Sequence, residues 1–261
     1  MTVKPMAHHS DAPARPTPRP GLTCVIGDVH GHIRKLEALF ELCEASTLPD
    51  ALFIFIGDYV DRGPDAKAVV ALLMDLQRCN PGRVLCLRGN HEAVVLAAAS
   101  DRMHTLPGGI DMDGWLRPQG GGRETLASYG VRRACDLPRE HLDWMASLPL
   151  FYDDGLRFFA HAGVHPARAL ADQEEDDLLW IREPFLSHAG NFGRLVVHGH
   201  TPVAARVPDL RVNRLNLDTA AGYDGPLTAA LFNGRQREPL GFLSAGGEVS
   251  FEVLMGTVGH D

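Results

Sequence analysis

The chain has 261 residues, of which 45% are hydrophobic, so it can bury a large core as one domain. Its formal net charge of −8 argues against a general nucleic-acid binder, although it allows one phosphate in a local positive site. No apolar run approaches membrane-spanning length, and no signal-peptide core is evident, so neither a membrane nor a nucleic acid is an expected partner. Three of the five cysteines lie in apolar patterns and none forms a C-x-x-C pair, which predicts reduced, buried thiols in a cytoplasmic protein.

The predicted elements begin after a proline-rich segment. Residues 1–21 show no periodic apolar pattern and are expected to form a disordered or extended tail, followed by one domain over 22–261. A strand-like run at 24–26 leads into an amphipathic helix from Ile33, then a strand at 52–56 and a helix over 66–78. This alternation, continued by a run at 84–87, is typical of a parallel sheet.

The segment 93–149 has a different character. Glycines punctuate it, strand patterns are missing, and helical patterns occur over 93–100, 123–129 and 138–148. We interpret it as a mostly helical excursion beside the site that shapes substrate access. The glycines at 120–122 could cradle a phosphate, but no strand precedes them, so loop flexibility is favoured.

Short alternating runs from residue 194 onward suggest further strands, several joined by glycine-containing turns. They lie at 215–217, 227–232, 240–243 and 249–254. With the preceding elements they predict an α/β fold in which two mixed sheets face each other with helices outside.

Polar clusters follow five of the strand-like runs at the point where each run ends. Open α/β sheets bind ligands at the carboxyl ends of their strands, so we expect these clusters to meet at one edge. A single cluster could be an ordinary turn or helix cap, but its recurrence favours a site. The clusters are Gly27–Gly31, Gly57–Gly63, Arg88–Glu92, His161–Gly163 and His198–His200.

Carboxylate, imidazole and amide oxygens are the donors in these clusters, a set that suits manganese, iron or zinc. Six donors are too many for one tetrahedral ion with an open position, but they suit two ions that share a ligand. Two dications roughly 3.5 Å apart repel by about 20 kcal/mol at an effective dielectric of about 20, so an anion must lie between them. We predict Asp58 as the bridging carboxylate and a water-derived hydroxide as the second bridge. The six donors are Asp28, His30, Asp58, Asn90, His161 and His200.

The ordered motifs GDVHG, GDYVDRG, GNHE, HAG and HGHTP resemble the phosphoprotein phosphatase branch of the calcineurin-like metallophosphoesterases, most closely the compact bacterial and bacteriophage lambda type. The match spans roughly residues 24–219. The resemblance implies the αββα sandwich of that family and two divalent metal ions, with manganese favoured over iron or zinc. By motif position, Asp28, His30 and Asp58 bind one metal, and Asp58, Asn90, His161 and His200 bind the other.

The resemblance also implies roles in catalysis. His91 corresponds to the general acid for the leaving-group oxygen, and Asp61 to the carboxylate that orients its imidazole. Arg62 and Arg182 resemble phosphate-clamping arginines, whose forked donors fit phosphoryl oxygens. A positioned acid matters because an alkoxide is a poor leaving group.

Several residues remain open. The family places the metal ligand at His200 rather than His198. Related enzymes carry another histidine ligand at the position of Pro202, so a metal site lacks it here. Arg88 could join the phosphate-binding group or pair with Glu92.

These observations predict a dimetal phosphomonoesterase that hydrolyses its substrate by direct attack of a metal-bridging hydroxide. Phosphoserine or phosphothreonine in a protein is the leading substrate, and a phosphorylated small molecule is also compatible. Symmetrical diadenosine tetraphosphate hydrolysis is the alternative on this scaffold, and Asp61 favours the protein phosphatase over it. A non-catalytic binding module is disfavoured, because only the optional ligand at Pro202 is missing.

Overall fold

The computed structural model of the protein describes residues 21–47, 50–246 and 251–253. The predicted proline-rich tail therefore lies outside the described residues, apart from Gly21. Within the described residues, no helix is long and apolar enough to cross a bilayer.

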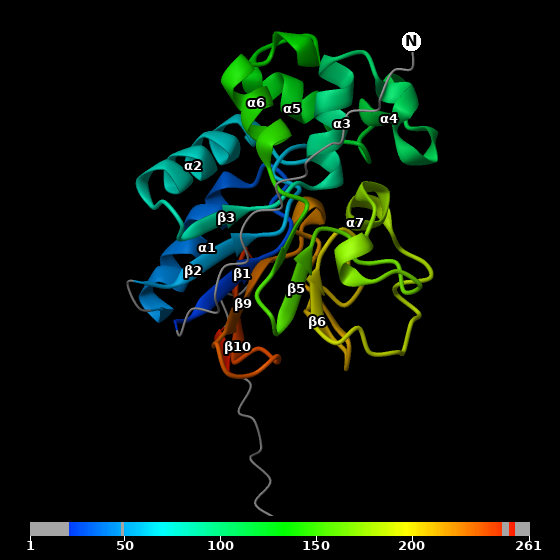
Figure 1. The fold of residues 1–261 in the computed structure, drawn as a ribbon. Helices are drawn as coiled ribbons and strands as arrows, with labels where there is room; N and C mark the ends of the chain where they lie inside the picture. The colour runs from blue at the N-terminus through cyan, green and yellow to red at the C-terminus, as the bar shows by residue number, and fades with distance from the viewer. Residues whose placement is uncertain (1–20, 48–49, 247–250, 254–261) are drawn as a thin grey trace, which may run out of the picture.

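Two mixed sheets form the centre of the fold (Figure 1), which confirms the predicted α/β sandwich. The first sheet has the order β11-β10-β9-β1-β2-β3, and in it β1, β2 and β3 are parallel whereas β9 to β11 are antiparallel. Its strands are β1 (Thr23–Ile26), β2 (Leu52–Phe55), β3 (Val84–Cys86), β9 (Leu227–Phe232), β10 (Gly241–Ala245) and β11 (Phe251–Val253).

The second sheet has the order β4-β5-β6-β8-β7. Its three central strands run parallel, and β4 and β7 pair antiparallel at its two edges. The strands are β4 (Phe151–Asp153), β5 (Arg157–Ala160), β6 (Leu195–His198), β7 (Asp209–Leu210) and β8 (Arg214–Asn216).

Alternate side chains of each central strand serve two separate cores. Val25 and Ile54 face the second sheet and pack in one cluster with Phe159 and Val197. The intervening residues of β1 and β2, such as Phe53, pack in another cluster with buried residues of the two helices that cover the outer face. Strands buried on both faces read as continuous apolar runs, which is why the sequence identified them.

The helices lie outside the sheets (Figure 1). Helices α1 (Ile33–Ser46) and α2 (Ala66–Cys79) cover the first sheet, and α7 (Glu175–Trp180) lies beside the second. A helical group above the strand ends comprises α3 (Asn90–Ala99), α4 (Met112–Trp115), α5 (Gly122–Tyr129) and α6 (Arg139–Ser147). Short 3-10 helices are η1 (Met103–Thr105), η2 (Pro107–Gly109), η3 (Ala134–Asp136), η4 (Leu170–Asp172) and η5 (Ala221–Tyr223).

Two expectations need correction. The five polar clusters do not follow one edge, because β1, β2 and β3 belong to the first sheet while β5 and β6 belong to the second. They meet across the carboxyl end of the sandwich instead. The cysteine expectation holds for Cys24, Cys43 and Cys86, which are buried, but Cys79 and Cys135 are exposed; all five thiols are free.

Candidate metal centre and pocket

Most of the predicted site residues lie on turns that directly follow strands, whereas Asn90 and His91 begin α3 and Arg182 follows α7. Five of them, His30, Asp58, Asp61, Arg62 and His200, adopt the left-handed backbone region, with φ between 46° and 68°. Non-glycine residues rarely adopt this region, and each such strained backbone costs about 1–3 kcal/mol. Strain at so many chemically active positions indicates that the turns are shaped for the site and held by the surrounding fold.

Glycines allow these turns to approach one another closely. A Cβ atom at Gly199 would overlap a carboxylate oxygen of Asp28, and one at Gly89 would overlap both the backbone and the side chain of Asp58. The glycines of the motifs are therefore required by contact with the acidic side chains, and any larger residue would displace a donor.

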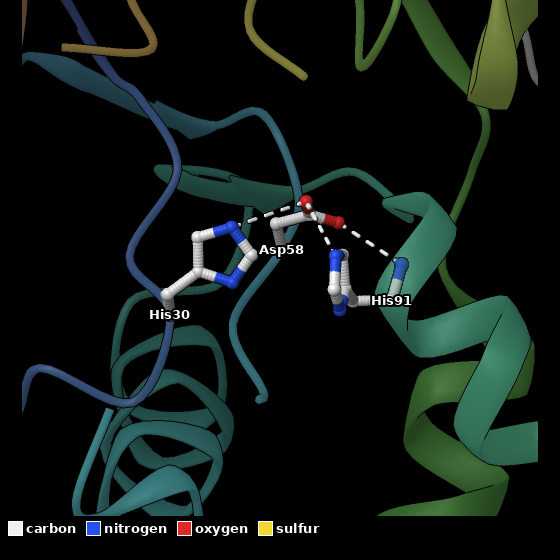
Figure 2. A group of neighbouring side chains, drawn as sticks. All are labelled: His30, Asp58 and His91. Carbon is white, nitrogen blue, oxygen red and sulfur yellow. Dashed lines mark hydrogen bonds and ion pairs between the residues drawn. The ribbon is translucent and has the colours of Figure 1, made fainter. Parts of the chain in front are cut away.

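Asp58 lies between His30 and His91 (Figure 2), and its two carboxylate oxygens face different neighbours. Its Oδ2 atom is 3.5 Å from Nε2 of His30, and its Oδ1 atom is 3.3 Å from Nε2 of His161. Asn90 joins the second side, because its Oδ1 atom is 2.8 Å from Nε2 of His161 and 2.9 Å from Nδ1 of His200. The two oxygens of one carboxylate thus face two different sets of donors, the arrangement that a bridging ligand requires.

The buried carboxylate of Asp28 lacks a partner for one of its two oxygens among the described residues. Asp28 and Asp58 are both 2% exposed, and Oδ1 of Asp28 has no hydrogen-bond partner among the described residues. Burial, together with Asp218 and Asp58, raises the pKa of Asp28 well above its usual value. Buried carboxylates in contact are costly unless cations lie between them, so this arrangement fits divalent metal ions.

The imidazoles are in the form that metals bind. Burial lowers the pKa of His30, His161 and His200, which favours the neutral ring, the protonation state that binds metals. Ligand atoms of Asp28, Asp58 and His161 all lie within 4.8 Å of one another, as do those of His30, Asp58 and His91. Both groups share Asp58. All six predicted donors are therefore brought together.

His91 and Asp61 form a hydrogen-bonded pair beside these donors. Nδ1 of His91 lies 2.7 Å from Oδ2 of Asp61, whose side chain is fully buried. Burial lowers the pKa of His91, but Asp58 and Asp61 more than offset this and hold the pKa above its usual value. Because Asp61 holds Nδ1, the other ring nitrogen, Nε2, is the one left to act in the pocket that His91 lines.

The two predicted arginines line a pocket of about 710 Å³ above the donors. Arg62 reaches over its floor, with Nη1 2.5 Å from Nε2 of His30 and Nη2 3.0 Å from Nε2 of His91. Its guanidinium also lies 4.6 Å from the ring centre of Tyr223. The pocket wall includes Trp180, the last residue of α7, and Arg182 just after it. From the side of the helical group it includes Ile110, Trp115 and Arg117.

Arg88 takes neither of the roles considered for it. Its Nη1 atom pairs with Oε1 of Glu175 at 3.2 Å, and Nη2 donates to the carbonyl of Ala146 at 2.7 Å. Glu92 instead accepts hydrogen bonds from the backbone N–H groups of Gly89, Asp58 and Tyr59 at 2.8–2.9 Å. It therefore ties the turn that carries Asp58 to the start of α3, a function that its place in GNHE did not reveal.

His198 lies outside the donor set. Its ring packs against Phe185 with centroids 4.9 Å apart, and its Nδ1 atom is 3.1 Å from the carbonyl oxygen of Gly199. Burial lowers the pKa of His198 to about 3, so the ring is a neutral core group.

Sequence reasoning missed three further residues at the site. Asp218 is 2% exposed, and burial raises its pKa to about 6; the only sequence signal was its position after the run at 215–217. Trp115 and Thr125 both hydrogen bond to Asp61 from the helical group. No local sequence pattern predicts this role for either residue, because Asp61 lies 54 residues from Trp115 and 64 residues from Thr125 in the chain.

The glycines at 120–122 also differ from the expectation of a flexible loop. The backbone N–H of Arg62 donates to the carbonyl of Gly121 at 3.2 Å, and Gly121 has φ of 84°. A Cβ atom at Gly122 would overlap the indole of Trp115. These glycines are packing positions that bring the helical group against the site.

Comparison with known proteins gives a family match over most of the chain. The model of the calcineurin-like phosphoesterase family matches residues 22–225. Serine/threonine-protein phosphatase 1 of Salmonella typhimurium is 29% identical over 213 residues, which cover 79% of this chain and 89% of that protein.

Solved structures share the fold at lower identity. A protein provisionally assigned as a diadenosine tetraphosphatase superimposes with a TM-score of 0.63 at 23% identity, covering 87% of this chain and 94% of its own. A mutant of a cold-active protein tyrosine phosphatase gives a TM-score of 0.57 at 17% identity, covering 90% of this chain and 80% of its own. At these identities the likeness concerns the fold.

Proposed function

Since this chain belongs to the calcineurin-like phosphoesterase family and is a phosphoester hydrolase, we propose that it is a dimetal serine/threonine protein phosphatase. The donors Asp28, His30, Asp58, Asn90, His161 and His200 would hold two divalent ions, with manganese favoured by the oxygen and imidazole donor set. When bound, such ions supply Lewis acidity and lower the pKa of a coordinated water.

The protein's own groups supply the remaining chemistry. Arg62 and Arg182 bind the phosphoryl oxygens and orient the phosphorus for in-line attack. His91 donates a proton from Nε2 to the departing alkoxide, and Asp61 stabilises the charged ring. The segment 93–149 borders the pocket through residues 107–120 and so shapes access to it.

The observation that carries this proposal is the hydrogen bond of 2.7 Å between His91 and Asp61. Serine and threonine alkoxides are strongly basic leaving groups and require protonation, so a buried acid pair is most useful on these esters. The relationship to the Salmonella phosphatase, which covers most of both chains, supports the same substrate class.

Diadenosine tetraphosphate hydrolysis is a second candidate. The pocket of about 710 Å³ is large enough for part of a dinucleotide, and the half-buried Trp180 on its wall offers a surface for base stacking. The shared fold of the provisionally assigned tetraphosphatase is compatible with this activity.

A direct comparison of the two substrates tests the proposal. Manganese-reconstituted protein would be assayed on a phosphothreonine peptide and on diadenosine tetraphosphate. We expect the higher kcat/KM on the peptide, whereas a preference of two decades for the dinucleotide would reverse the ranking. Arg182→Gln should lower kcat/KM on the preferred substrate at least tenfold, and the exposed Arg34→Gln should serve as a neutral control.

A further inference from the structure

The carboxylate of Asp61 receives more hydrogen bonds than its pairing with His91 requires. Nε1 of Trp115 donates to Oδ2 at 2.9 Å, the same oxygen that lies 2.7 Å from Nδ1 of His91. The hydroxyl of Thr125 donates to Oδ1 at 2.6 Å and accepts from the backbone N–H of Asp61 at 2.8 Å. Asp61 and Thr125 are fully buried and Trp115 is 2% exposed, so water does not compete for these bonds.

The two donors come from a part of the chain separate from the strand-end turns. Trp115 ends α4 and Thr125 lies in the first half of α5, more than fifty residues after Asp61. The indole is fixed in place by Gly122, where any side chain would overlap it. Trp115 also lines the pocket, so one side chain belongs both to the pocket wall and to the support of Asp61.

From this geometry we infer that Trp115 and Thr125 are positioning residues for general-acid catalysis by His91, acting through Asp61. The inference rests on the proposed function and adds two residues to it. Asp61 can hold the His91 ring only if its own carboxylate cannot rotate. One donor on each carboxylate oxygen fixes that rotation and keeps Oδ2 facing Nδ1 of His91.

This role predicts a dependence on the leaving group. A nitrophenolate leaves without needing a proton, whereas the alkoxide of phosphoserine needs one, so loss of acid positioning should slow only the second ester strongly. Damage to the metal donors or to the fold would slow both esters alike. The ratio of the two rates therefore separates acid positioning from a merely structural role.

The test uses the full-length protein with manganese, assayed on O-phosphoserine and on p-nitrophenyl phosphate. Trp115→Phe keeps an aromatic ring but removes the N–H donor, and we expect about a tenfold loss of kcat on O-phosphoserine with less than a threefold loss on the aryl ester. Trp144→Phe is the matched control, because its indole N–H donates to Gln77 at 2.7 Å, outside the pocket. It should leave the ratio of the two rates unchanged.

Thr125 provides a second, independent arm should Trp115→Phe fail to fold. Thr125→Val removes the hydroxyl at nearly constant volume and should reproduce the selective loss, while Thr125→Ser should restore the wild-type ratio. Bound manganese, measured by mass spectrometry, should stay at the wild-type level in every variant. Equal losses on both esters, loss of metal, or no rescue by serine would overturn the inference.

The outcome is distinguishable from failure of the proposed function. Both assay substrates are simple phosphomonoesters, so the ratio can be measured whether or not the natural substrate is a phosphoprotein. Absence of activity of the wild-type protein on the phosphothreonine peptide would reject the proposed substrate. A wild-type-like ratio in both Trp115→Phe and Thr125→Val would reject the positioning role.

Discussion

The strand-end turns and the helical group over 90–147 meet at Asp61, and they are built on different principles. The turns carry their chemistry in short motifs, with left-handed backbone at His30, Asp58 and His200 and with glycines packed against acidic side chains. The helical group contributes single side chains, Trp115 and Thr125, from positions without a motif. The candidate metal donors are therefore placed by local sequence, whereas the hydrogen bonds that hold the Asp61 carboxylate depend on tertiary contacts.

The largest loss of activity should follow from Asp58→Asn, which replaces the carboxylate shared by the two donor sets. The side-chain amide has one neutral oxygen, whereas the carboxylate has two that share a negative charge. The donor set that contains His30 and the set that contains His161 would therefore lose the anion that they share. We expect turnover to fall by at least about 10³-fold and bound metal to drop, as read by steady-state kinetics and mass spectrometry. Asp75→Asn, which breaks an exposed ion pair with Arg78, is the control.

His91→Ala should give the next largest effect. A positioned general acid contributes about 10²–10⁴-fold, and we expect a loss in this range on O-phosphoserine but at most about tenfold on p-nitrophenyl phosphate. Parallel kinetics on the two esters provide the measurement. Equal losses on the two esters would show that His91 is not the general acid. The helical group would then have no role in catalysis through Asp61 and His91.

The donors on the strand-end turns could be predicted from the sequence. Asp28, Asp58 and Asn90 were identified because each follows a buried apolar run, so the strand and its donor lie within a few residues of each other. The two-sheet fold was predicted from the strand-like runs along the chain and from the family resemblance of the motifs. That the turns of β5 and β6 come from the opposite sheet was not predicted, because sheet membership depends on long-range pairing.

The contacts of the helical group with the site could not be predicted from the sequence. Its helices were recognisable from periodicity, yet the hydrogen bonds of Trp115 and Thr125 to Asp61 span 54 and 64 residues and leave no local signature. The glycines beside Gly121 looked like flexible loop for the same reason, since their close partners, Arg62 and Trp115, are known only from the fold.

Gly122→Ala tests the contribution of the helical group, because it changes the packing around Trp115. Alanine favours a helix by about 1 kcal/mol over glycine, but its methyl group would overlap the Trp115 indole. We expect a net destabilisation of about 1–3 kcal/mol in chemical denaturation and a selective loss of about tenfold on O-phosphoserine. Gly130→Ala is the control, because Gly130 has φ of 68° and no atom of the described residues lies within 4 Å of an added Cβ. It should reduce stability without changing the ratio of the two rates.

The smallest effect concerns His198, which lies beside the strand-end turns but outside the donor set. Its folded-state pKa of about 3 lies below the unfolded value of about 6.5, so between these pH values the unfolded chain binds more protons. The free energy of unfolding should therefore fall as pH drops below about 6.5, by up to about 1.4 kcal/mol per pH unit from this group.

His198→Leu should remove that contribution. Urea denaturation at pH 7.0 and pH 5.5 provides the measurement, and the variant should lose less stability than the wild type over this interval, by on the order of 1 kcal/mol. An unchanged pH dependence would mean that His198 is not the buried neutral group described above.

Anomalous diffraction from manganese-loaded crystals tests the central claim most directly. We predict two peaks roughly 3.5–4 Å apart, one on each side of the Asp58 carboxylate, with His30 beside one peak and His161 beside the other. A single peak, or two peaks that both lie away from Asp58, would contradict the account.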